Sequence, residues 1–302
     1  SDNTAVGYQS LFTNTTGTAN SATGFLALKA NTSGSYNAAF GTKSLQANTT
    51  GANNTAVGND SGQANTTGTE NTSVGAGSFY YNSTGNYNTA IGRLALFNNT
   101  TASNNTAVGF ESLKSNTTGT SNTAVGYGAG IANTTGGALV AIGMNALAAN
   151  TTGDTNIAIG VEALHDNTTG GENVALGYRA LDVNTTAGYN TAIGTNALGA
   201  NTTGSQNTAL GREALQNNTT ANSNTSVGTN SMNGNTTGAS NTALGHSALR
   251  TNSTGASNVA VGLSALYANT TGTHNVGIGT NTLDAMTTGS YNTALGSGAL
   301  SA

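Results

Sequence analysis

A glycine recurs every seventeen residues along this chain, and this regularity limits the possible folds more than any other feature of the sequence. Eighteen such glycines run from Gly7 to Gly296 without a single insertion or deletion. A strict short period is the signature of a solenoid, in which each repeat stacks on the one before it. Residues 1–302 are therefore predicted to form one repetitive domain, with seventeen complete coils from Asn3 and a partial coil over 292–302.

Each repeat can be numbered in columns one to seventeen from its leading asparagine, which places the recurring glycine in column five. Column three is Ala, Ser or Gly, and column four is Val, Ile or Leu except at Thr23 and Phe40. Column eight is small, column nine is mostly Leu, and columns twelve to fifteen read Asn-Thr-Thr-Gly. Short strands broken by glycine turns fit this pattern, whereas a helical hairpin does not. The sequence predicts an all-β parallel β-solenoid of about eighteen coils, with neighbouring strands about 4.8 Å apart.

Composition agrees with stacked strands and excludes several classes of protein. Only 6% of the residues are charged, and proline, which would remove a backbone donor from a strand, is absent. No apolar run approaches the roughly 20 residues that a membrane-spanning helix needs. A net charge of −4 gives no basic stripe, so nucleic acid is not an expected partner. The absence of cysteine excludes a disulfide framework.

The distribution of charge predicts which columns face water. No charged residue occurs in columns one to five, eight, nine or twelve to fifteen, so these columns are predicted to be buried or stacked. Val108, Val125 and Ile142, all in column four, should form one continuous apolar row along the stack. Glu162 and Arg179 share column seven in adjacent coils and should form a surface ion pair.

The same columns predict self-association. Columns three and four point to opposite faces of one strand, yet both avoid charged side chains. A coil of seventeen residues encloses only one interior, so something else must cover the second face. Copies of the chain around a common axis would do so, and a homotrimer is expected. The alternatives are a dimer, or a flat solenoid that tolerates small residues on its outer face.

The repeated pentads carry a resemblance to a known family. NTAVG, NTAIG and NTALG resemble the SVAIG-type pentads in the head domains of trimeric autotransporter adhesins. The longer unit NTAIGxxALxxNTTGxx is similar to repeats in bacterial and phage proteins of the tail-fibre type. The resemblance covers the whole chain. It implies a left-handed parallel β-roll, three chains packed into a fibre, and a location outside the cell, at the cell surface or on a virion.

Residues that could support catalysis or ligand binding are scattered. The Asn of column twelve fits the N-glycosylation motif, but sugars every 4.8 Å or so would collide, and an inward asparagine ladder is the preferred interpretation. His165, His246 and His274 lie in different columns and coils, so neither a metal site nor a catalytic triad is predicted. No phosphate-binding loop or carboxylate cluster is present either, and we expect no cofactor and no enzymatic activity.

Exposed aromatic residues are the one suggestive feature for binding. Rings in columns six and seventeen could stack on sugars or host surfaces, although packing over turn edges is the simpler interpretation. The candidate adhesive surface is the set in column seventeen: Tyr36, Tyr87, Tyr189 and Tyr291.

The expected function is that of an extracellular structural fibre or adhesin segment, a rigid repetitive rod that presents surface for attachment. Its expected partners are itself and host or surface glycans or proteins, with no membrane within the segment. One alternative is an ice-binding solenoid that uses the threonine rows of columns thirteen and fourteen, although adjacent residues of a strand face opposite sides. A phage tail-fibre shaft and a polysaccharide-acting enzyme are the others, and the enzyme lacks an acid–base cluster.

Overall fold

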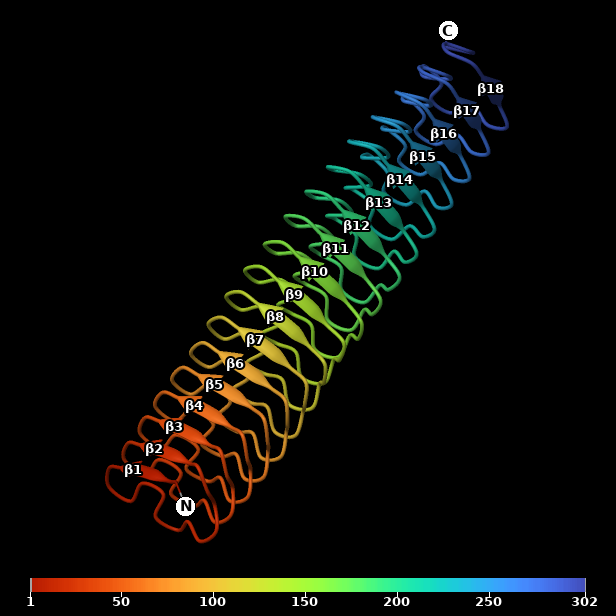
Figure 1. The fold of residues 1–302 in the computed structure, drawn as a ribbon. Helices are drawn as coiled ribbons and strands as arrows, with labels where there is room; N and C mark the ends of the chain where they lie inside the picture. Colours follow the sequence, from red (N-terminus) through yellow and green to blue (C-terminus); the bar gives the residue numbers. More distant parts are fainter. Residues whose placement is uncertain (1, 302) are drawn as a thin grey trace. The chain divides into compact units, whose positions relative to one another are not determined.

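The computed structural model describes residues 2–301, and every regular element in this range is a strand of three residues (Figure 1). Contacts divide the chain into two compact units, Ser1–Asp154 and Thr155–Ala302. The first unit contains β1 (Thr4–Val6), β2 (Ser21–Thr23), β3 (Ala38–Phe40), β4 (Thr55–Val57), β5 (Thr72–Val74), β6 (Thr89–Ile91), β7 (Thr106–Val108), β8 (Thr123–Val125) and β9 (Val140–Ile142). The second contains β10 (Ile157–Ile159), β11 (Val174–Leu176), β12 (Thr191–Ile193), β13 (Thr208–Leu210), β14 (Thr225–Val227), β15 (Thr242–Leu244), β16 (Val259–Val261), β17 (Val276–Ile278) and β18 (Thr293–Leu295). No helix long and apolar enough to cross a membrane occurs in residues 2–301.

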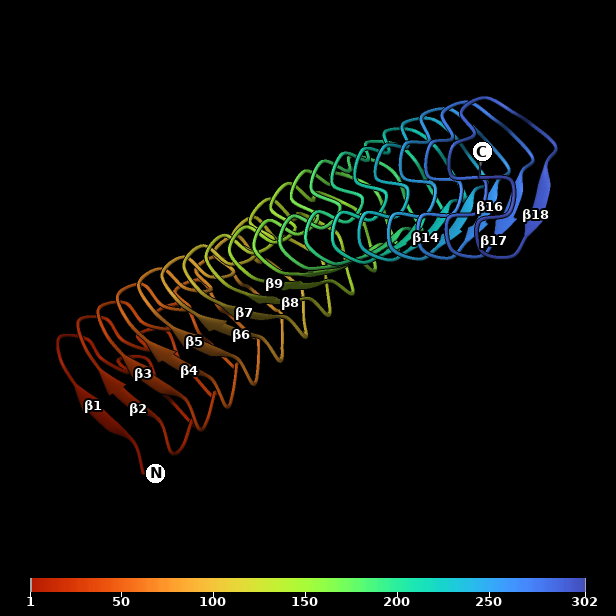
Figure 2. The same ribbon diagram turned by 90° about the horizontal axis from the view of Figure 1, so that it is seen from above.

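Within each unit, successive strands pair in parallel with a shift of one repeat. Val108 lies beside Val125, and Val125 lies beside Ile142, as the glycine period predicts. In the second unit Ile193 pairs with Leu210 in the same way. Figure 2 shows that the strands of a unit stack on one side of its coils, while the rest of each coil is turns and irregular chain. The predicted parallel β-solenoid with a seventeen-residue repeat is confirmed.

Backbone hydrogen bonds join each coil to the coils on both sides of it. Gly109 N–H donates to the Ile91 carbonyl of the preceding coil at 2.8 Å. Leu113 N–H donates to Ala129 of the following coil at 3.0 Å. Donors are thus used in both directions, which explains why a chain of this design contains no proline.

The core of each coil is thin and is built from small side chains. Ala107 and Ala124 of column three are fully buried, and Leu113 of column nine packs in the same interior. By contrast, Val125 and Ile142 of column four are 36% and 37% exposed. Column four is therefore the outer of the two uncharged faces predicted for each strand, because successive side chains of a strand alternate between the two faces and the coil has one interior.

Left-handed backbone closes each coil. Gly109 of column five has φ 134°, and a Cβ atom placed there would lie 2.4 Å from the Gly126 carbonyl oxygen. Columns seven, nine and seventeen also adopt positive φ, with values of 56° at Glu111, 48° at Leu113 and 60° at Ser121. Such a conformation costs an L-residue about 1–2 kcal/mol. The bonds between coils must offset this cost at three non-glycine positions in most coils.

Two buried asparagine ladders run through the coils, in columns one and twelve. Asn116 Nδ2 donates to Asn99 Oδ1 at 3.0 Å, and Asn133 Nδ2 donates to Asn116 Oδ1 at 2.9 Å. In column one, the Asn122 backbone N–H donates to Asn105 Oδ1 at 3.0 Å. The predicted inward ladder is confirmed, and these amides are buried in the folded chain.

The column-twelve ladder breaks at Met286, the one non-asparagine residue of that column. Asn269 Oδ1, in the preceding coil, consequently has no donor. Within residues 2–301 it is the one buried side-chain polar atom without a hydrogen-bond partner. A single departure from the repeat therefore leaves one buried hydrogen-bond acceptor unsatisfied.

Candidate functional site

The column-seventeen tyrosines are exposed, but the fold does not gather them into a surface. Tyr36 and Tyr87 lie three repeats apart in the first unit, and Tyr189 and Tyr291 lie six repeats apart in the second. Their exposed fractions range from 57% at Tyr87 to 78% at Tyr291, and all four adopt positive φ in turns. Tyr291 stacks on the His274 ring at a centroid distance of 4.9 Å. Each tyrosine is therefore an isolated ring or one member of a stacked pair.

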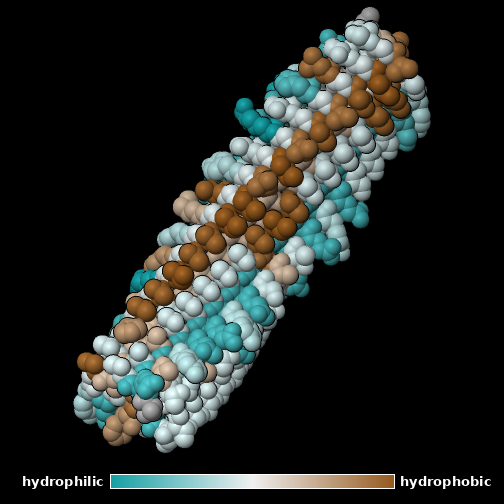
Figure 3. All heavy atoms as spheres, viewed as in Figure 1, coloured by the Kyte–Doolittle hydropathy of each residue, from teal (hydrophilic) through white to brown (hydrophobic). Residues whose placement is uncertain are grey.

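The column-four side chains form a continuous outward row in each unit, which we call the apolar ridge (Figure 3). Leu210 is 45% exposed and Leu244 is 48% exposed, although both belong to strands. The ridge of the first unit is Val6, Thr23, Phe40, Val57, Val74, Ile91, Val108, Val125 and Ile142. That of the second is Ile159, Leu176, Ile193, Leu210, Val227, Leu244, Val261, Ile278 and Leu295.

The apolar ridge is bordered by column two, on the same face of the strands. This column is mostly Thr, Val or Ile and is half-buried or exposed. No charged residue occurs in either column. The outer strand face of each unit is therefore an uncharged surface with a regular row of branched aliphatic side chains, a composition that is unusual for a surface that remains in water.

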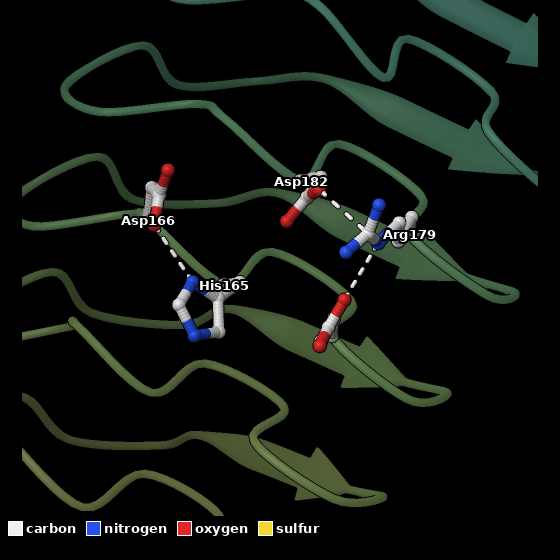
Figure 4. A network of polar contacts seen from close by, with 5 residues as sticks. His165, Asp166, Arg179 and Asp182 are labelled. Atoms are coloured by element: carbon white, nitrogen blue, oxygen red, sulfur yellow. Dashed lines mark hydrogen bonds and ion pairs between the residues drawn. The ribbon is translucent and has the colours of Figure 1, made fainter.

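Charged side chains meet in one part of the second unit (Figure 4). Arg179 Nε donates to Glu162 Oε2 at 2.6 Å, which confirms the predicted ion pair, and lies 3.7 Å from Asp182 Oδ2. The hydrogen bond to Glu162 raises the pKa of Arg179 further above its ordinary value. Burial raises the pKa of Asp182, and the positive charge of Arg179 opposes that rise. His165 Nδ1 lies 2.7 Å from Asp166 Oδ1 nearby.

A hollow of about 360 Å³ opens beside Arg179 and Asp182. Columns seven, ten and eleven of three successive coils supply its walls, which are Arg179, Asp182, Val183, Asn196, Gly199, Ala200, Gln216 and Asn217. Sequence reasoning missed this site, because its signal is the absence of a side chain. Gly199 is the one glycine in column ten of the chain.

The three histidines are not brought together. His165, His246 and His274 come from three different coils, as the sequence predicted. Residues 2–301 contain no group of three His, Cys, Asp or Glu side chains placed to hold a metal ion. Three buried serines of the first unit do contact one another, but their hydrogen bonds go to each other and to backbone carbonyl oxygens: Ser61, Ser73 and Ser78.

The two threonine rows of the NTT motif differ in their exposure. In column thirteen, Thr117 Oγ1 donates to the Thr134 carbonyl at 3.0 Å, and both side chains are half-buried. Thr118 and Thr135 of column fourteen are exposed. The column-thirteen hydroxyls are thus engaged by the backbone of the next coil, whereas the column-fourteen side chains are the more exposed of the two rows.

Comparison of this chain with protein families, with curated proteins and with solved structures finds no match.

Proposed function

We propose that this chain is a segment of an extracellular structural fibre or adhesin that assembles with copies of itself and presents surface for attachment, without catalysis. The observation that carries the proposal is the apolar ridge. In each unit it joins strand to strand without interruption by a charge, on a backbone held in register by asparagine ladders and parallel pairing. The location outside the cell rests on the resemblance of the NTAIG-type pentads to adhesin and tail-fibre repeats.

A second copy of the chain is the occupant that fits the ridge best. Its own ridge has the same seventeen-residue period, so side chains such as Leu210 and Leu244 can meet equivalent side chains coil by coil. Soluble monomers rarely leave continuous apolar patches larger than a few hundred Å² uncovered. Closed cyclic symmetry buries an identical row on every copy, and we propose a homotrimer.

Attachment would then use the parts of the repeat that remain outside the assembly. Columns six, seven, ten, eleven and seventeen hold nearly all of the charges and the exposed aromatic rings. These columns vary from coil to coil while the ladders and the core are kept. Variation can therefore change the surface without a change in the fold, as in other repeat proteins that bind ligands along an extended surface.

Light scattering on the purified segment tests the assembly. The chain has a mass of 29.6 kDa, and we expect a particle of about three times that mass. The double variant Leu210→Glu/Leu244→Glu should lower the mass to that of one chain, because it places carboxylates in the ridge. The matched control Thr220→Glu/Thr254→Glu adds the same charges to exposed column-fourteen positions of the same coils and should leave the mass unchanged. A stable, soluble wild-type monomer would refute the proposal.

Two further assays separate the alternative functions. A thermal-hysteresis measurement on the wild-type segment should show no depression of the freezing point, since only one hydroxyl row of the NTT motif is exposed. A polysaccharide hydrolysis screen should yield no product, since the carboxylates that lie close together, Glu162 and Asp182, are both engaged by Arg179. Activity in either assay would favour that alternative over a structural fibre.

A further inference from the structure

We propose that the hollow at Gly199 is a binding site for one unit of a neutral saccharide. Saccharide binding at this hollow would serve attachment, so its biological role rests on the proposed function. The binding itself can be measured whether or not the chain assembles with copies of itself.

The hollow lies where column ten, which carries a side chain in all the other coils, has a glycine. Column ten carries Asp182 in the coil before and Gln216 in the coil after, and Gly199 lies between them. In the second unit the other column-ten residues are His, Asn, Arg, Tyr, Asp and Ser, all with polar side chains. The gap is therefore one coil wide, with a polar side chain at each end.

Neither the backbone nor the packing requires glycine at this position. Gly199 does not have the positive φ that columns five, seven, nine and seventeen adopt. A Cβ atom there would make one tight contact, 3.3 Å from the Asn196 carbonyl oxygen, with its next neighbours at 3.7 Å. The other seventeen coils all carry a side chain at this position of the repeat. By comparison, a Cβ atom at Gly194 in the same coil would lie 2.5 Å from a backbone oxygen. The glycine at 199 thus leaves space open that a side chain could otherwise fill.

The walls of the hollow offer both donors and acceptors in a small volume. Asn196, Gln216 and Asn217 each carry an amide that donates through nitrogen and accepts through oxygen. Asp182 adds a carboxylate acceptor and Arg179 adds a guanidinium donor, while Val183 and Ala200 supply apolar surface. A sugar ring has hydroxyl groups that donate and accept, together with apolar C–H faces. The volume of about 360 Å³ lies at the small end of the range for ligand pockets.

The charges favour a neutral ligand over an ionic one. Arg179 is already paired with Glu162 at 2.6 Å and lies 3.7 Å from Asp182, so its positive charge is balanced by two carboxylates. A phosphate or sulfate would meet that negative charge at the wall. A metal ion is disfavoured as well, since the described residues hold no cluster of three ligands. Asp182 is half-buried at the wall of the hollow, and this burial raises its pKa.

Saturation-transfer NMR on the intact segment tests the site with four neutral probes, namely lactose, maltose, cellobiose and N-acetyllactosamine. We expect at least one to bind, and we expect sialyllactose, the charged counterpart of lactose, to bind no better than lactose. Gly199→Gln should weaken binding at least tenfold, because it restores the missing side chain of column ten. The matched control Asp284→Gln changes column ten five coils away and should bind as the wild type does.

Two results would overturn the inference: no binding of any neutral probe to the wild type, or equal binding by Gly199→Gln. Tighter binding of sialyllactose than of lactose would overturn the assignment of a neutral ligand. Circular dichroism of Gly199→Gln, which should match the wild type, checks that a loss of binding is not a loss of fold. Light scattering on the same samples reports the assembly, so a failure here is distinct from a failure of the proposed fibre.

Discussion

Removal of one rung of an asparagine ladder should destabilise the coil around it by several kcal/mol. Asn116 is fully buried; its Nδ2 donates to Asn99 Oδ1 and to the Gly119 carbonyl, and its Oδ1 accepts from Asn133 Nδ2. In Asn116→Ala the Gly119 carbonyl keeps a second donor, Asn105 Nδ2 at 3.0 Å. Asn99 Oδ1 is left without a donor, and one N–H of Asn133 Nδ2 is left without an acceptor. An orphaned buried polar group costs about 1–3 kcal/mol, so the expected loss is about 2–6 kcal/mol.

Hydrogen exchange is the suitable assay, because long repeat arrays do not unfold in one cooperative step. The amide of Thr117, which donates to the Thr134 carbonyl at 2.9 Å, reports on the coil that contains Asn116. At 1.4 kcal/mol for each factor of ten, its exchange should accelerate roughly 30-fold to 10⁴-fold. The control Thr118→Ala, at an exposed position of the same turn, should change it little. Acceleration of less than about fivefold in Asn116→Ala would show that the ladder contributes little, and would refute this reasoning.

Three further predictions follow from single positions. Met286→Asn should stabilise the end of the second unit by about 1 kcal/mol, measured by hydrogen exchange, because it supplies the missing donor for Asn269 Oδ1; an unchanged or lower stability would contradict this. Gly109→Ala should destabilise by at least about 1–3 kcal/mol in the same assay, because φ is 134° there, whereas Gly199→Ala should be nearly neutral. For Asp182, burial raises the folded-state pKa above 3.8, so the folded state holds this proton more tightly than the unfolded state does. Its contribution to the free energy of unfolding should therefore increase as pH falls through the raised pKa towards 3.8. Asp182→Asn should remove this dependence of the free energy of unfolding on pH. If the same dependence persists in the variant, this carboxyl is not its source.

The register of the fold could be predicted in full, because an uninterrupted period allows one alignment of each coil on the next. Val108, Val125 and Ile142 therefore lie in one row, as predicted, and Glu162 meets Arg179. The direction in which column four faces could not be predicted from charge. A position that avoids charge can be buried within the coil or left apolar on its outer face, and both produce the same sequence pattern.

The turns were predicted only in part for a similar reason. Glycine at column five indicates positive φ, because glycine adopts it without steric cost. Leu113 and its equivalents in column nine also adopt positive φ, and leucine carries no sequence signal for that conformation. The positive φ of column nine is instead imposed by hydrogen bonds between coils, in which the column-nine N–H donates to a carbonyl group of the neighbouring coil.

The solenoid, the repeat length, the ladder of buried asparagines and the columns open to variation could all be inferred from the amino-acid sequence. Each of these follows from the chemistry of a column that repeats at a fixed interval. Which apolar column lies on the surface, and which residues surround Gly199, are evident only from the three-dimensional fold. These features depend on contacts between different columns of different coils, because the turns bring column seven beside columns ten and eleven in a way that no period in the sequence records.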